Sequence, residues 1–164
     1  MVLLVSCSKS HAPLPTVPEI DLNKYAGRWY EIARLPNRFE KSLECVTATY
    51  TLRPDGNINV LNQGRKADNP AKTDDAEAKA WVPDPRHPAR LKVQFFWPFT
   101  GDYWVLDLAP DYSYSLVGEP SREYLWILSR TPELDEATFN RLLEKAKAQG
   151  FPVEKMEKIK QDCS

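Results

Sequence analysis

The sequence predicts an all-β domain, a meander of strands that closes into a barrel or a sandwich, followed by one helix. Eight short segments alternate apolar and polar residues, and turn-forming residues separate them at regular spacing. After residue 130 the apolar residues recur with the period of a helix instead. With 164 residues, the chain fits one domain that is long enough to bury a core.

The eight segments are expected to form strands in chain order. The clearest one sets Val46, Ala48 and Tyr50 against threonines on its other face, and the Pro-Asp-Gly sequence of residues 54–56 follows as a hairpin turn. Alternation of this kind is typical of a strand with one buried face. The expected strands are residues 28–35, 43–52, 58–66, 75–82, 90–97, 102–109, 112–118 and 123–130.

The segment 131–150 is expected to contain the helix, with Asp135 as its N-cap and Gly150 just beyond its C-terminus. One face of this segment is apolar and consists of Phe139, Leu142, Leu143 and Ala146. A helix that follows eight strands has to bury such a face on the outside of the sheet. The tail after Gly150 has enough apolar residues for one short extra strand.

Charge and motifs exclude several classes of protein. The net charge is −1, with 22 basic and 23 acidic residues mixed along the chain, so nucleic acid is not an expected partner. The sequence has no nucleophile-elbow, zinc-protease or nucleotide-binding motif, and neither His11 nor His87 has the setting of a catalytic base. None of the three cysteines belongs to a Cys-x-x-Cys pair. We therefore expect no metal, no cofactor and no enzymatic activity.

The N-terminus is expected to carry a lipid anchor. Leu4-Val5-Ser6-Cys7 has the apolar, small, small, Cys pattern of a bacterial lipobox, in which the cysteine is acylated after cleavage. The apolar stretch before Cys7 is shorter than the roughly 7–15 residues of a secretory signal. We therefore expect an incomplete signal, either because the chain starts too late or because it is truncated. The alternative is a cytosolic protein whose apolar N-terminus arose by chance.

This interpretation divides the chain into two parts. Residues 1–18 form a partial lipoprotein signal, the lipidation cysteine and a Pro-rich tether, and residues 19–164 form the folded domain.

Three short motifs, in order, resemble those of the lipocalin family. They are Gly27-x-Trp29, then Asp111-Tyr112, where Pro110 replaces the usual Thr, and then Arg130. The resemblance covers residues 19–164 and is greatest to bacterial outer-membrane lipoprotein lipocalins and to apolipoprotein D. It implies an eight-stranded antiparallel up-and-down β-barrel with the C-terminal helix packed outside and a short extra strand. It also implies that Trp29 plugs the floor of the barrel, with Arg130 stacked over it as a cation–π pair.

The resemblance and the alternation together imply which side chains point into the barrel and bind a ligand. Small residues among them leave volume, and the apolar wall suits a small amphiphilic lipid, a fatty acid or a lysophospholipid. The alternative is a barrel packed solid with its own side chains. The expected ligand-binding residues are Val46, Ala48, Tyr50, Val60, Asn62, Ala78, Ala80, Leu91, Val93, Phe95, Tyr103, Val105, Val117, Tyr124 and Trp126.

Residues at the open end of the barrel are expected to determine which lipid head group the protein binds. One loop there offers Arg38, Phe39 and Lys41, and a hairpin tip offers Trp97 and Phe99. Aromatic residues beside basic ones suit contact with a membrane. The alternative is ordinary packing of aromatic residues within loops.

Cys45 and Cys163 are expected to form a disulfide, because they remain once Cys7 is assigned to the lipid. The resemblance supports this, since apolipoprotein D has a cysteine at each matching place, and the alternative is two free buried thiols. Cys45 lies on the face opposite Tyr50, the wrong side for a barrel nucleophile.

The sequence thus predicts a non-enzymatic carrier of fatty acids or lysophospholipids that serves membrane maintenance. We expect it on the periplasmic face of a bacterial outer membrane, held there by the lipid anchor. Two alternatives stay open, a lipid-modifying enzyme and an interaction module with a filled barrel. Whether two copies form a homodimer is also open.

Overall fold

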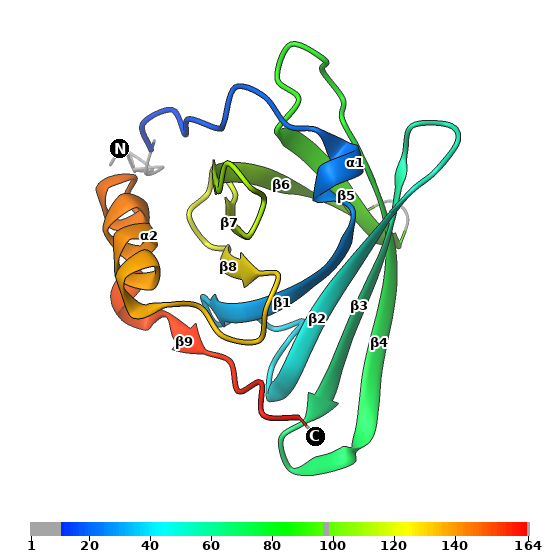
Figure 1. Ribbon diagram of the computed structural model, residues 1–164, viewed down its shortest axis with the longest axis vertical. Coiled ribbons are helices and arrows are strands. Elements are labelled where there is room, and N and C mark those ends of the chain that lie inside the picture. The colour runs from blue at the N-terminus through cyan, green and yellow to red at the C-terminus, as the bar shows by residue number, and fades with distance from the viewer. Residues whose placement is uncertain (1–10, 97–98, 164) are drawn as a thin grey trace, which may run out of the picture.

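The computed structural model describes residues 11–96 and 99–163 and has an antiparallel barrel with one longer helix and a ninth strand outside it (Figure 1). The order of the sheet is β2-β3-β4-β5-β6-β7-β8-β1-β9, and β1 also pairs with β2. The barrel strands are β1 (Gly27–Arg34), β2 (Leu43–Leu52), β3 (Ile58–Lys66), β4 (Asn69–Trp81), β5 (Arg90–Phe96), β6 (Phe99–Leu108), β7 (Tyr114–Gly118) and β8 (Leu125–Ser129). The other elements are α1 (Leu22–Tyr25), α2 (Glu136–Ala148), the 3₁₀ turn η1 (Val153–Lys155) and β9 (Glu157–Lys158).

Strand β1 closes the barrel by pairing on both sides. Its first half, Gly27 to Tyr30, pairs with β2, and its second half, Tyr30 to Arg34, pairs with β8. A bulge between Glu31 and Ala33 lets the strand bend from one neighbour to the other. The eight-stranded antiparallel barrel expected from the sequence is thus confirmed.

Strand β4 begins six residues earlier than the expected start at residue 75. Residues 69–73 are exposed, so they have no buried face and no apolar alternation that a sequence reading could detect. They are held instead by backbone pairing with the end of β3, for example Arg65 with Thr73. In Figure 1, β2, β3 and β4 form a long ribbon that extends beyond the rest of the barrel.

The short helix α1 is an element that the sequence did not predict. The Asp21 side chain caps it by accepting a hydrogen bond from the Asn23 backbone N–H at 2.9 Å. Four residues are too few to produce a helical hydrophobic period, which explains why the pattern gave no signal. Tyr25, its last residue, is buried in the barrel.

Helix α2 packs its apolar face on the outside of the barrel, as predicted. Phe139, Leu142 and Ala146 are buried there against a second core cluster that includes Leu125 and Ile127 of β8. Asp135 caps the helix by accepting from the Thr138 N–H, and Gly150 has the positive φ of a residue that follows a helix.

The C-terminal tail is fastened to the barrel across β1 and β2. Strand β9 pairs with Ala33 and Arg34, and the Gln161 side chain donates to the backbone oxygens of Glu31 and Val46. Cys45 and Cys163 form a disulfide with Cα atoms 6.0 Å apart, which confirms the predicted pairing. Because 118 residues separate the two cysteines, the bridge ties the start of β2 to the very end of the domain.

Two sequence expectations lie outside the described residues. They are the lipidation of Cys7 and the position of Trp97 at the tip of the β5–β6 hairpin. In the part of the chain that is described, no helix has the length and apolar character needed to cross a membrane.

Candidate functional site

The barrel encloses a cavity of about 790 Å³ that opens at one end. This volume lies within the range of roughly 300–1,000 Å³ that is usual for small-molecule sites. Strands β1 to β6, strand β8 and the loop between β1 and β2 all contribute to its wall. The expected ligand-binding residues that border it are Val46, Ala48, Tyr50, Val60, Asn62, Ala80, Leu91, Val93, Phe95, Tyr103, Tyr124 and Trp126.

Three of the expected wall residues, Ala78, Val105 and Val117, do not border the cavity. Val105 and Val117 are completely buried in the same core cluster as Tyr25 and Trp29, so they fill the closed end of the barrel. Ala78 is half-buried and packs against that cluster. Alternation along a strand distinguishes inside from outside but gives no height along the barrel, which is why Val105 and Val117 were grouped with the wall.

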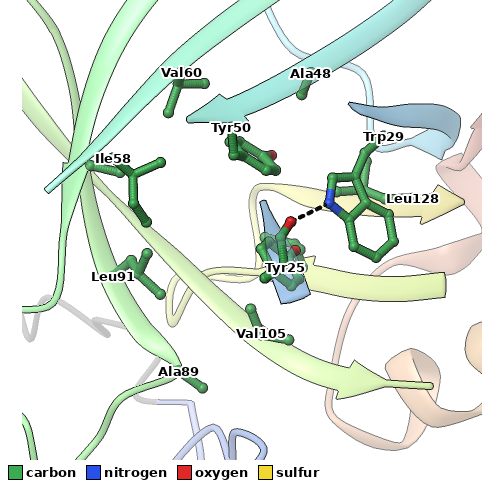
Figure 2. Close-up of a cluster of buried hydrophobic side chains, with 12 residues drawn as sticks. Tyr25, Trp29, Ala48, Tyr50, Ile58, Val60, Ala89, Leu91, Val105 and Leu128 are labelled. Carbon is green, nitrogen blue, oxygen red and sulfur yellow. Dashed lines mark hydrogen bonds between the residues drawn. The ribbon is translucent and has the colours of Figure 1, made fainter. Parts of the chain in front are cut away.

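The floor of the barrel is built around Trp29, whose side chain is completely buried. Figure 2 shows its indole N–H donating to the Tyr25 backbone oxygen, at 2.8 Å. The Arg130 guanidinium carbon lies 3.8 Å from the centroid of the Trp29 ring. The cation therefore covers the outer face of the indole.

Arg130 also joins separate segments by donating to main-chain oxygens. Its acceptors are the backbone oxygens of Lys24, Tyr25, Arg28 and Tyr112. Gly27 has φ +98°, and a Cβ there would lie 3.3 Å from Nη1 of Arg130, so both the backbone conformation and the available space favour glycine. Asp111 accepts from the Ser113 N–H and stabilises the turn in which Tyr112 has a positive φ.

A chain of hydroxyl groups lies just above the floor. Tyr103 contacts Tyr25 at 2.7 Å and Tyr50 at 2.9 Å, oxygen to oxygen, and Tyr25 contacts Ser115 at 3.0 Å. Burial raises the pKa of Tyr25 to about 12 and also raises the pKa values of Tyr50 and Tyr103. The three tyrosine hydroxyls are therefore neutral near pH 7, and they form a polar region at the bottom of the mostly apolar cavity.

The mouth of the cavity is aromatic on one side. The Tyr124 and Trp126 rings are stacked with centroids 5.8 Å apart, and Phe39 lies 6.4 Å from Tyr124. Phe39 is 60% exposed, and the guanidinium of Arg38 lies 4.9 Å from its ring centroid. Arg38 and Phe39 border the cavity, whereas Lys41, expected beside them, does not.

An ion pair is buried in the wall close to this mouth, and the sequence analysis did not identify it. The Arg34 Nη1 donates to Glu31 Oε1 at 2.8 Å, and both residues are less than 5% exposed. Burial raises the pKa of Glu31 well above its usual value, the nearby Glu40 raises it further, and Arg34 opposes the shift. Glu31 is two residues from Trp29 in the same strand, so the alternation of that strand could have shown that its side chain points inward. Glu40 lies in a loop, where no alternation indicates the direction of a side chain.

Neither a free cysteine nor a group of metal ligands is present among the described residues of the barrel. Cys45 is in a disulfide and so cannot act as a nucleophile. Among residues 11–96 and 99–163, no three His, Cys, Asp or Glu side chains are grouped so that they could hold a metal ion. What the geometry offers is a large, mostly apolar cavity with a few polar groups, which is the composition of a binding site.

Comparisons with known proteins agree with this geometry. The family of lipocalin-like domains matches residues 20–161. The outer membrane lipoprotein Blc of Escherichia coli K12 is 44% identical over 164 residues, covering 99% of this chain and 92% of that protein. Temperature-induced lipocalin-1 of Arabidopsis thaliana is 44% identical over 157 residues, covering 90% and 83%. Apolipoprotein D of Bos taurus is 38% identical over 154 residues, covering 88% and 79%.

Proposed function

The chain belongs to the lipocalin family, and from that premise we propose that it is a non-enzymatic carrier of amphiphilic lipids, either fatty acids or lysophospholipids. The cavity holds the acyl chain, and the polar mouth receives the head group. The protein works from a lipid anchor at a bacterial outer membrane, where it serves membrane maintenance.

The cavity is the observation that carries this proposal. A barrel filled by its own side chains would suit an interaction module, whereas about 790 Å³ of open volume suits a ligand. The wall at mid-height is made of small and aliphatic residues such as Ala48, Ala80 and Val60. Transfer of an acyl chain into such surroundings gains about 0.8 kcal/mol for each buried CH₂ group.

The proposed anchor rests on Cys7 and on the relatives. The relative in Escherichia coli is named an outer membrane lipoprotein, which fits acylation of Cys7. Plant and animal relatives are also similar, so membership of the family by itself does not fix the location. Mass spectrometry of the mature native protein tests the anchor. We expect an acylated Cys7 at the N-terminus, and an unmodified Cys7 thiol would contradict it.

Binding in the cavity is tested by Ala80→Phe. Ala80 is 4% exposed and borders the cavity, so the added ring should occupy the space of the acyl chain. We expect displacement of a fluorescent fatty-acid probe to show a loss of affinity of at least about tenfold, equivalent to about 1.4 kcal/mol. Circular dichroism and the melting temperature verify that the variant still folds.

A matched control is available on the same strand. Ala71 of β4 is exposed and does not border the cavity, so Ala71→Phe makes the same chemical change away from the site. It should bind the probe as the parent does. Equal affinity for the Ala80→Phe variant and the parent would mean that the acyl chain binds elsewhere, and failure of the parent to bind any lipid would refute the carrier function.

A further inference from the structure

A second hollow lies on the outside of the barrel, and its lining is basic. It is a groove of about 410 Å³ between the N-terminal segment, strands β5 and β6, and the loop from β7 to β8. Its basic residues are His11, Arg90 and Arg122, and none of its lining residues in the described chain is acidic. The barrel cavity differs, because acidic residues such as Glu31 and Glu77 border it. The groove therefore has the charge that suits an anionic ligand.

Arg90 brings to this groove a guanidinium group with an unused donor. Its Cζ atom lies 4.5 Å from the centroid of the Trp104 ring, and this cation–π contact fixes the position of the charge. Its Nε atom is buried and has no hydrogen-bond partner among the described residues. A buried donor without an acceptor is destabilising, so an acceptor supplied by a ligand would stabilise it. The residue as a whole is only half-buried, so a ligand in the groove can reach it.

Arg122 is a second cation of the groove, and it is almost fully buried, at 5% exposed. Its guanidinium donates to the backbone oxygens of Ala12, Pro120 and Gln149, at 2.7, 2.7 and 2.9 Å. These oxygens carry no net charge, and none of the ion pairs in the described part of the chain includes Arg90 or Arg122. Burial lowers the pKa of Arg122. An anion in the groove would supply the opposite charge that both arginines lack.

A phosphate group matches these donors. The guanidinium of arginine is a planar fork that donates to two oxygens in parallel, which is why arginine is common in phosphate sites. A tetrahedral phosphate directs its oxygens to different sides, so it can accept from two separate guanidinium groups at once.

The groove lies next to the point where the proposed anchor joins the domain. His11 borders the groove and follows Cys7 by four residues. At about 3.6 Å per residue, an acylated Cys7 would lie no more than about 14 Å from His11. Figure 1 shows the start of the described chain close to helix α2, where Arg122 joins Ala12 to Gln149. A membrane that holds the acyl chains of Cys7 would therefore bring phospholipid head groups within reach of the groove.

We propose that Arg90 and Arg122, with the Trp104 ring stacked on Arg90, form a site for the phosphate group of an anionic phospholipid in the membrane that carries the anchor. This inference goes beyond the carrier function, because the site lies outside the barrel cavity and binds a lipid that stays in the membrane. It rests on the proposed anchor only for the source of the phosphate.

The site would also orient the protein on the membrane. The loop of residues 119–124 carries Arg122 and also borders the barrel cavity through Glu119 and Tyr124. A phosphate held by Arg122 would keep this loop at the level of the head groups. The anchor alone would fix only the distance of the domain from the membrane, whereas the anchor and the phosphate site together would also fix which side faces it.

The first test observes the side chain of Arg90 directly. The full chain is labelled with ¹⁵N and titrated with inorganic phosphate, and sodium chloride at the same ionic strength is the reference. We expect the Arg90 Nε–H resonance to shift in a saturable way with phosphate and to stay unchanged with chloride. Absence of a phosphate-specific shift would overturn the site.

The second test asks whether the phosphate belongs to a membrane. Flotation compares binding of the full chain to vesicles of phosphatidylglycerol and to vesicles of phosphatidylcholine. The parent should prefer phosphatidylglycerol, and Arg90→Gln should weaken binding to these vesicles by at least about fivefold, the effect of one basic residue at an anionic surface.

Arg28→Gln is the matched control for charge. Arg28 is exposed on β1 and does not border the groove, so this variant removes one positive charge away from the site. It should bind phosphatidylglycerol vesicles about as tightly as the parent. An equal loss in Arg28→Gln and Arg90→Gln would mean that net charge alone causes the binding, and it would overturn the site.

A measurement on the parent keeps the inference testable if Arg90→Gln does not fold. A ligand that binds only the folded state raises the melting temperature. Phosphate should therefore raise the melting temperature of the parent relative to chloride at equal ionic strength, and an unchanged value would contradict the site.

The remaining outcomes separate the source of the phosphate from the other proposals. A shift of the Arg90 resonance with inorganic phosphate, together with equal binding to both kinds of vesicle, would indicate a site for free phosphate and would overturn its assignment to the membrane. An unmodified Cys7 thiol would refute the anchor, and failure of every lipid to displace the fatty-acid probe would refute the carrier function. Neither of those two results depends on Arg90.

Discussion

The two ends of the barrel treat polar groups in opposite ways. At the floor, the indole N–H of Trp29 and the donors of Arg130 all have partners within the chain. At the mouth, the carboxyl groups of Glu31 and Glu40 lie beside each other at the cavity, and Phe39 is 60% exposed. Buried polar groups are costly without partners, so an end whose groups are all paired contributes mainly to stability. An end whose acidic and aromatic side chains border the cavity is where a ligand can add interactions.

The largest expected effect comes from removing the floor. Trp29→Ala should lower the free energy of unfolding by about 3–5 kcal/mol, because a fully buried aromatic side chain is replaced by a cavity. Arg130→Ala should cost less, about 0.5–2 kcal/mol for the lost cation–π contact, with a further contribution from its hydrogen bonds to four backbone oxygens. Urea denaturation monitored by circular dichroism measures both changes.

Phe39→Ala at the mouth is the control for this pair. Its ring is mostly exposed, so the free energy of unfolding should change by no more than about 0.5 kcal/mol. If Trp29→Ala and Arg130→Ala cost as little as Phe39→Ala, those two residues would not form the stabilising end of the barrel.

A smaller effect is expected from Glu31→Gln at the mouth, and it depends on pH. The pKa of Glu31 is raised above its ordinary value of 4.5 by burial and by Glu40, so between the two pKa values the folded state binds more protons than the unfolded state. The stability that Glu31 contributes is therefore complete below pH 4.5 and is lost as the pH rises through the raised pKa.

Denaturation at a series of pH values should show this slope in the parent and a flatter profile in Glu31→Gln. The glutamine oxygen can still accept from Arg34, which limits any loss that does not depend on pH. A parent whose stability does not change across this range would mean that Glu31 titrates as it does in an unfolded chain.

Alternation and turn residues predicted most of the fold. The eight strands and the outer helix were recognised because each has a buried face, as with Val46, Ala48 and Tyr50 of β2. The start of β4 and the helix α1 were missed because neither has a periodic apolar face. Pairing of backbone groups with β3 and a side-chain cap hold these segments instead, and such contacts leave no pattern in a single segment.

The candidate site was predicted less completely. Sequence reasoning found the aliphatic wall but placed Val105 and Val117 in it, whereas both pack in the closed end. It also missed the carboxyl pair, because Glu31 and Glu40 come together only when the loop after β1 folds over the end of the barrel.

Local periodicity in the sequence therefore determined the strands and the outer helix, and a small choice of partners gave the cysteine pair. The closed barrel and the residues of its floor followed from the three motifs that resemble those of lipocalins. Only the tertiary structure decided how deep each inward side chain lies and which polar groups meet at the mouth of the cavity. Both depend on distances between segments that are far apart in the chain, such as Glu40 and Trp126, whose side chains meet at 3.0 Å across 86 residues. Periodicity within one strand carries no information about such distances.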